Sequence, residues 1–126
     1  MAHGWVSHFS DSIEVYSAGT MPAQKVNPFA IEVMKKFNID ISSNSTNDVK
    51  DYEEIEFSLV LTVCDKAKET CPVVFNTLES KHKSFPDPFE YKGTDEEKLD
   101  HYLEVCIAIR NWIREVLREE GLVENY

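Results

Sequence analysis

Two cysteines seven positions apart, Cys64 and Cys71, are the residues of this sequence best suited to covalent chemistry. Cys64 comes directly after the mostly apolar run 59–63, and Cys71 precedes a proline. Open α/β sheets carry their chemistry at the ends of such buried strands. In an acidic chain without signs of secretion, two thiols at this place favour redox work over a structural disulfide.

The spacing of the two thiols restricts how they can react with each other. In one regular helix over residues 64–71 the two Cα atoms would be about 10 Å apart, whereas a disulfide requires about 7 Å or less. A Cys64–Cys71 bond therefore requires the segment to bend or unwind, which predicts a switch that is folded when reduced and looped when oxidised. The plain alternative is a strand-end cysteine that acts as a small hydrophobe and an unrelated loop cysteine.

Asp87 is the next candidate, because it lies between two prolines in Phe85-Pro86-Asp87-Pro88. Prolines restrict the backbone, which suits a carboxylate held at the rim of a sheet as a general acid or base. The same pattern is also that of an ordinary turn aspartate. The residues alone favour neither interpretation over the other.

A zinc site made of Cys64, Cys71 and His82 is a further alternative. Zinc ligands usually occur in pairs two to four residues apart, and this spacing does not match. The histidines His3, His8, His82 and His101 show no mutual spacing. We therefore expect surface or hydrogen-bonded histidines, and neither a metal nor a cofactor.

The overall composition limits the classes of function to consider. The chain has 126 residues, of which 42% are hydrophobic, enough for one compact domain over residues 1–126. Its formal net charge of -10 repels phosphate backbones and anionic lipids, which argues against nucleic-acid and membrane partners. No apolar run approaches the roughly 20 residues that span a bilayer, and no signal peptide is visible. We expect a cytoplasmic protein with reduced thiols at rest.

Helices and strands alternate along the chain, as in a parallel sheet with helices on both faces. Asn27-Pro28 is a good start for a helix. Thr94-Asp95-Glu96-Glu97 is a capping box before a long amphipathic helix that Gly121 ends. That helix has Cys106 on its apolar stripe, so this third cysteine is expected in the core. The expected elements are helices at 1–9, 28–38 and 94–121, strands at 13–17, 59–63 and 80–85, and a loop with a short helix at 42–51.

Short segments spread over essentially the whole chain carry a family resemblance. They are residues 13–20, 26–28, 30–34, 39–42 and 61–65, the pair Cys71-Pro72, and Phe85-Pro86-Asp87-Pro88. Together they resemble the arsenate reductases coupled to thioredoxin, which share the three-layer α/β fold of low-molecular-weight tyrosine phosphatases. Phosphatases of this superfamily generally lack the cysteine pair, so the pair favours the reductases.

The resemblance implies a relay of three thiols and no cofactor. A first cysteine, in a Cys-x5-Arg loop that binds the oxyanion, attacks arsenate. Cys64 attacks the arsenic adduct and releases arsenite, and Cys71 then resolves the resulting disulfide. The Cys64–Cys71 bond is reduced by thioredoxin, and Asp87 assists proton transfer near the nucleophile. The implied role is arsenical resistance in the cytoplasm.

The chain departs from the family pattern at the nucleophile. None of its three cysteines is followed six positions later by arginine: those positions hold Thr70, Thr77 and Trp112. We expect an N-terminally truncated product that lacks the first central strand and the Cys-x5-Arg loop, and is inactive as given. Upstream DNA without an in-frame strand and loop would contradict this expectation.

Loss of a central strand leaves the edges of strands 13–17 and 59–63 exposed. The sheet is then expected to rearrange or to be completed by a partner chain, as in a homodimer. Two other functions remain open. One is a low-molecular-weight tyrosine phosphatase, which gives Cys71 no role. The other is a non-catalytic binding or redox-switch protein of the same fold.

Overall fold

The computed structural model describes residues 1–18, 27–44, 47, 49–52, 54–63, 76–77, 79–86 and 91–123. The chain divides into two compact units. Unit 1 comprises Met1–Tyr16, Val26–Asn44 and Asp87–Tyr126, and unit 2 comprises Ser17–Lys25 and Ser45–Pro86. One domain over residues 1–126 stays a prediction. In the described part of the chain, no helix combines the length and apolar character needed to cross a membrane.

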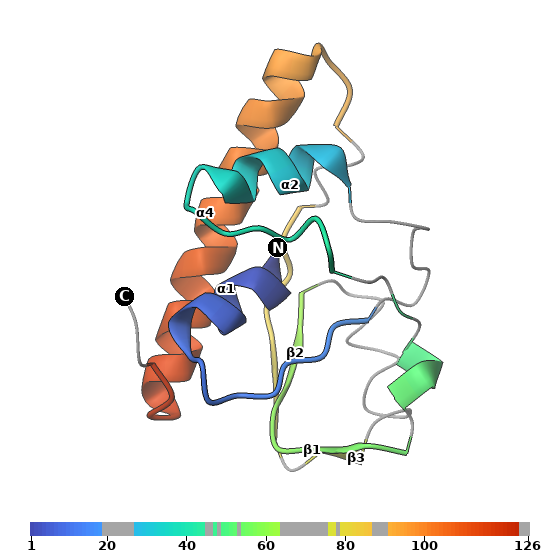
Figure 1. Ribbon diagram of the computed structural model, residues 1–126, viewed down its shortest axis with the longest axis vertical. Coiled ribbons are helices and arrows are strands. Elements are labelled where there is room, and N and C mark those ends of the chain that lie inside the picture. The colour runs from blue at the N-terminus through green and yellow to red at the C-terminus, as the bar shows by residue number, and fades with distance from the viewer. Residues whose placement is uncertain are drawn as a thin grey trace. The chain divides into compact units, whose positions relative to one another are not determined.

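The described part of unit 1 contains three helices, α1 (Ala2–Phe9), α2 (Pro28–Lys35) and α4 (Asp95–Glu119). Both α1 and α2 pack against the long α4 (Figure 1). The apolar stripe of α4 forms one side of the core, as its 3.6-residue period predicts. The buried apolar residues of this unit are Trp5, Phe9, Ala30, Val33, Met34, Ile41, Tyr102, Val105, Cys106, Ile109, Ile113, Val116 and Leu117.

The packing of α1 on α4 is anchored by an aromatic cluster around Trp5. The Trp5 ring lies 5.1 Å from the ring of Phe37 and 5.7 Å from that of Phe9, measured between centroids. The guanidinium group of Arg110, on α4, lies 5.7 Å from the Phe37 ring and 6.0 Å from the Trp5 ring. The cation thus covers the edge of an apolar cluster and gains from the ring electrons.

The predicted helix boundaries in unit 1 are confirmed with one shortening. Asn27 caps α2 by accepting a hydrogen bond from the amide of Phe29 at 2.8 Å. The helix ends at Lys35, three residues before the predicted end, because the chain tightens into a turn that closes at Asn38 with a positive φ of 62°. Asparagine tolerates this left-handed conformation. Gly121 adopts a φ of 69° where α4 ends, as predicted.

Unit 2 contains a parallel ribbon of two chain segments. Strand β1 (Glu56–Phe57) pairs with β3 (Asn76–Thr77), and β2 (Val60–Thr62) pairs with β4 (Ser80–His82). Every pair joins residues 20 positions apart, as Thr62 and His82 are, so the two short ladders keep one register. Between the two ladders, the Val60 amide donates a hydrogen bond of 2.9 Å to the Glu79 carbonyl. A short 3-10 helix, Val49–Tyr52, lies in the predicted loop.

The predicted strands at 59–63 and 80–85 are confirmed as β2 and β4. On β2, Val60 and Thr62 are buried while Leu61 is partly exposed. The strands β1 and β3 were not predicted, because two residues are too short to show a pattern. The α/β class with a small parallel sheet is as predicted.

The predicted strand at 13–17 is wrong. Burial does alternate along this segment: Ile13 and Val15 are partly buried, and Glu14 and Tyr16 are exposed. No strand is formed there, however. A period of two specifies which side chains face inward, but a strand also needs a ladder partner, which the pattern does not supply.

Candidate functional site

The carboxyl ends of β2 and β4 place two polar side chains against each other in unit 2. Thr62 and His82 are direct partners in the parallel register. The Thr62 hydroxyl oxygen and the His82 Nδ1 atom are 2.6 Å apart, a short hydrogen bond. Thr62 is only 6% exposed, so its hydroxyl needs such a partner.

The pairing continues beyond the two strands. The Lys83 amide donates to the Thr62 carbonyl, and the Phe85 amide donates to the Val63 carbonyl, each at 3.1 Å. In the sequence, Cys64 comes directly after Val63, and Asp87 is the second residue after Phe85. Hydrogen bonds therefore join the two described segments that end at Val63 and Pro86, directly before Cys64 and Asp87 in the sequence.

All three predicted site residues, Cys64, Cys71 and Asp87, lie outside the described residues. Their predicted roles consequently stay predictions, and so does the redox switch of the segment 64–71. The zinc alternative is likewise untested, since two of its three ligands, Cys64 and Cys71, lie outside the described residues. Over the described ranges, no group of three His, Cys, Asp or Glu side chains could hold a metal ion.

Cys106 is the one cysteine among the described residues, and it is fully buried on α4. Its thiol lies 3.4 Å from the Met34 sulfur. Burial raises the pKa of the Cys106 thiol, which disfavours the reactive thiolate. The prediction that Cys106 belongs to the core is confirmed.

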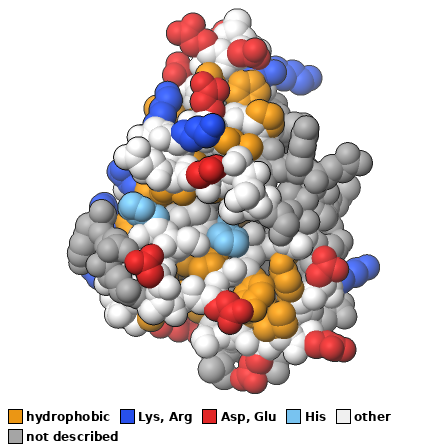
Figure 2. Space-filling view, in the orientation of Figure 1, with side chains coloured by type: hydrophobic (Ala, Val, Ile, Leu, Met, Phe, Trp, Pro, Cys, Tyr) orange, Lys and Arg blue, Asp and Glu red, His pale blue; other side chains and the backbone are white. Residues whose placement is uncertain are grey.

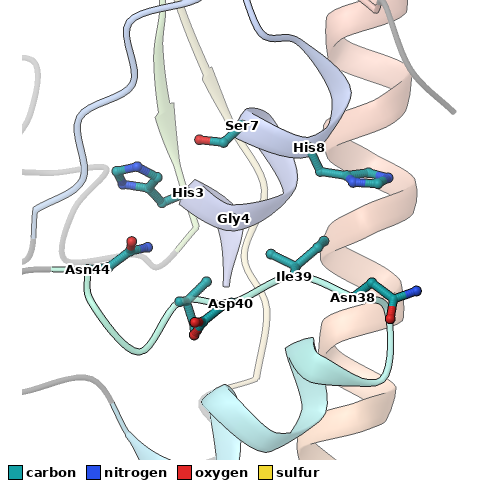
Figure 3. A pocket seen from close by; sticks show the side chains of 9 residues that line it. His3, Gly4, Ser7, His8, Asn38, Ile39, Asp40 and Asn44 are labelled. Carbon is teal, nitrogen blue, oxygen red and sulfur yellow. The ribbon is translucent and has the colours of Figure 1, made fainter.

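Unit 1 carries a pocket of about 290 Å³ that sequence reasoning did not find. It lies between α1 and the segment that follows α2 (Figure 3). In this view the side chains of His3 and Asn44 gather on one side, and those of His8 and Asn38 on the other. The lining residues are His3, Gly4, Ser7, His8, Asn38, Ile39, Asp40, Ile41 and Asn44.

Local contacts and burial shift the pKa values of two titratable groups in this pocket, Asp40 and His3. The Asp40 carboxylate accepts from the Ser42 hydroxyl at 2.6 Å and from the Ser42 amide at 2.9 Å, and these bonds lower the pKa of Asp40. Burial, followed by the charge of the N-terminal amine, lowers the pKa of His3. The pocket thus favours a neutral His3 imidazole.

One sequence signal could have located this pocket: the glycine inside α1. A Cβ atom at Gly4 would lie 2.8 Å from the Met34 Cε atom and 2.9 Å from the Ile41 Cγ2 atom. Those distances are too short for a side chain, so Gly4 marks the close approach of another segment to the helix. Acidic side chains, in contrast, are spread over the visible surface without one dominant patch (Figure 2).

Comparison with known proteins gives consistent matches. The model of the family "Low molecular weight phosphotyrosine protein phosphatase" matches residues 6–122. An arsenate reductase of Bacillus subtilis (strain 168) is 38% identical over 117 residues, which is 91% of this chain and 83% of that protein. An arsenate reductase of Staphylococcus aureus (strain Newman) is 39% identical over 114 residues, 89% and 84% of the two chains.

Two solved structures share the fold. An arsenate reductase in the oxidized state matches with a TM-score of 0.78 and 18% identity, covering 94% of this chain and 86% of the other. An arsenate reductase in the reduced state matches with a TM-score of 0.60 and 20% identity over the same shares. At these identities the likeness concerns the fold.

Proposed function

This chain belongs to the low molecular weight phosphotyrosine protein phosphatase family and, within it, to the arsenate reductases, and from that premise we propose that it reduces arsenate to arsenite through a cysteine thiol–disulfide relay. Its fold is the phosphatase-like α/β fold of that family. The observation that carries the proposal is the match to the Bacillus subtilis arsenate reductase along 91% of this chain. The cysteine pair seven positions apart supports it.

The proposed roles follow from thiol chemistry. A cysteine in a Cys-x5-Arg loop binds arsenic, and the Cys64 thiolate attacks that cysteine's sulfur, so that arsenite leaves with two electrons. The Cys71 thiolate then attacks the Cys64 sulfur, and the first cysteine leaves as a thiolate that takes up a proton. The product is a Cys64–Cys71 disulfide. We assign Asp87 to proton transfer at the first cysteine.

The reductant in this proposal is thioredoxin, whose two thiols reduce the Cys64–Cys71 disulfide by the same exchange chemistry and are themselves oxidised to a disulfide. The reducing cytoplasm is the compartment that suits resting thiols. We also propose a homodimer that pairs exposed strand edges. Light scattering tests the dimer, and a monodisperse monomer would contradict it.

The printed sequence holds no cysteine followed six positions later by arginine. We therefore propose that this polypeptide by itself does not turn over arsenate. The Cys64–Cys71 half of the relay remains within the chain, and it needs an oxyanion-binding loop to act on arsenate.

The test compares the printed chain with a fusion that adds a strand and a Cys-x5-Arg loop before Met1. Arsenate-dependent NADPH oxidation is followed with thioredoxin and thioredoxin reductase. We expect turnover by the fusion alone, and its loss in Cys64→Ser and in Cys71→Ser. Cys106→Ser is the matched control, because this buried thiol has no role in the relay. Turnover that survives Cys71→Ser would contradict the proposal.

The rival function is a low-molecular-weight tyrosine phosphatase, which the name of the matching family favours. It needs the same Cys-x5-Arg loop and assigns no role to Cys71. Hydrolysis of p-nitrophenyl phosphate by the fusion, insensitive to Cys64→Ser and Cys71→Ser, would support it. A fusion inactive in both assays would favour a non-catalytic binding or redox-switch protein.

A further inference from the structure

The hydrogen bond between Thr62 and His82 has a special place in unit 2. It joins the last paired residues of β2 and β4. Its length is 2.6 Å, and the Thr62 side chain is buried while His82 is half-buried. Water therefore competes poorly for the Thr62 hydroxyl, and the contact ties the two strands together through their side chains.

Hydrogen bonds beyond the backbone ladder of β2 and β4 hold the end of β2 just before Cys64 in the sequence. They include the Thr62–His82 side-chain bond and the two backbone bonds from Lys83 and Phe85 to the carbonyls of Thr62 and Val63. The side-chain bond is the one that a substitution removes without altering the backbone. It thus offers a direct way to loosen this strand end.

We propose that the Thr62–His82 hydrogen bond positions Cys64 for thiol–disulfide exchange with Cys71, an inference that rests on the proposed function. The spacing of the two cysteines requires the segment between them to bend. In this proposal the bond holds the strand end at Thr62, to which Cys64 is joined two positions later in the sequence. Thiol–disulfide exchange within a chain is fast only when the attacking thiolate and the attacked disulfide sulfur are aligned. Thr62 and His82 are positioning residues in this proposal.

A purely structural role makes a different prediction. If the bond only satisfies a buried hydroxyl, its loss lowers the stability of the fold but leaves the exchange between folded molecules unchanged. The two roles are therefore separated by a rate measured on folded protein.

The experiment uses the printed chain and glutathione. In the first step the Cys64 thiolate attacks oxidised glutathione, giving a mixed disulfide and one glutathione thiolate. In the second step the Cys71 thiolate attacks the Cys64 sulfur, and the second glutathione leaves as a thiolate that takes up a proton. Two protein thiols are oxidised as one oxidised glutathione becomes two reduced ones. Acid quenching, alkylation and mass spectrometry follow each species.

Thr62→Val removes the hydroxyl at nearly constant volume, and we expect the second step to slow roughly three- to tenfold, the range for one lost hydrogen bond. The first step should change less than about twofold, because it needs no alignment with Cys71. Thr62→Ser keeps the hydroxyl and should restore the rate. Ser80→Ala is the matched control, since it removes an exposed hydroxyl from β4.

The opposite strand supplies an independent pair of variants. His82→Leu removes the partner and should slow the second step like Thr62→Val, whereas His82→Asn keeps a polar atom close to the Nδ1 position and should restore it. The double variant Thr62→Val/His82→Leu should be no slower than either single one, because all three lack the same bond. Circular dichroism verifies the fold, and the His82 variants decide the question if Thr62→Val is unfolded.

The outcomes separate the two proposals. If the unaltered chain forms no Cys64–Cys71 disulfide, the relay itself is wrong. If that disulfide forms equally fast in folded Thr62→Val and in the unaltered chain, the relay stands and the positioning role is overturned.

Discussion

Cys106 differs from the other two cysteines in its surroundings. Its side chain is fully buried on α4, and its sulfur lies 3.4 Å from that of Met34. Burial raises the pKa of its thiol, because the thiolate would lose its hydration. The residue is therefore a core hydrophobe, and the chemistry proposed for this chain falls to Cys64 and Cys71.

Alkylation at pH 8 tests this distinction. Below the raised pKa the Cys106 thiol stays protonated, so we expect Cys106 in the folded chain to react with iodoacetamide at least about tenfold more slowly than in urea. Its rate should rise as the pH increases toward that pKa. Peptide mass spectrometry measures each cysteine separately, and equal rates for Cys106 with and without urea would contradict the prediction.

Gly4 supports a second prediction at the scale of the residue. Alanine favours a helix over glycine by about 1 kcal/mol, but here its Cβ would lie 2.8 Å from Met34 and 2.9 Å from Ile41, both buried. Overpacking of a filled core costs about 1–3 kcal/mol. We expect Gly4→Ala to lower the urea midpoint of unfolding. Ser7→Ala, on an exposed position of α1, is the control, and a higher midpoint for Gly4→Ala would show that the core adapts.

At the scale of the element, α4 shows how a local sequence signal fixes a helix start. The Thr94 hydroxyl accepts from the Glu97 amide at 3.2 Å, and the Glu97 carboxylate accepts from the Thr94 amide at 3.4 Å. These reciprocal bonds satisfy two amides that the helix leaves without partners. Asp95, Glu96 and Glu97 add negative charge where the helix dipole favours it.

Thr94→Ala tests the contribution of this cap. Loss of the side-chain acceptor should lower the free energy of unfolding by about 1 kcal/mol. Thr94→Ser keeps the hydroxyl and should differ from the unaltered chain by less than about 0.5 kcal/mol. Urea unfolding followed by circular dichroism provides both values. Equal losses in the two variants would show that the methyl group, and not the cap, matters.

At the scale of the whole molecule, burial is unevenly shared between the two units. Among the described residues, every buried apolar side chain except Val60 belongs to unit 1. Most of the hydrophobic stabilisation visible in the described ranges therefore arises around α4. The described strands of unit 2 are short, and Val60 is the one buried apolar side chain among the described residues of this unit.

Hydrogen exchange tests this difference. Amides of residues 102–117, on the buried face of α4, should exchange at least about tenfold more slowly than those of β2 and β4, because local opening is easier where fewer apolar contacts are lost. Mass spectrometry of peptic peptides gives the protection of each element. Comparable protection of β2 and α4 would show that both units open together.

The sequence predicted elements well where the signal is local. The cap at Thr94, the stop at Gly121, the start at Asn27 and the core position of Cys106 each depend on nearby residues or on a helical period, and the structure confirms them. The prediction of a strand at 13–17 failed, because the alternation of Ile13 and Val15 does not specify a pairing partner for the segment. For Cys64, Cys71 and Asp87 the prediction remains one of sequence alone.

By itself, the sequence determined the family and the candidate thiols, because residue types at fixed spacings carry that chemistry. It also determined the helices, because hydrogen bonds within a helix join residues four positions apart. Only the tertiary structure decided the register that sets Thr62 against His82, 20 positions away, and the approach of Ile41 to Gly4. Contacts between distant segments depend on how the whole chain packs, and no local pattern encodes them.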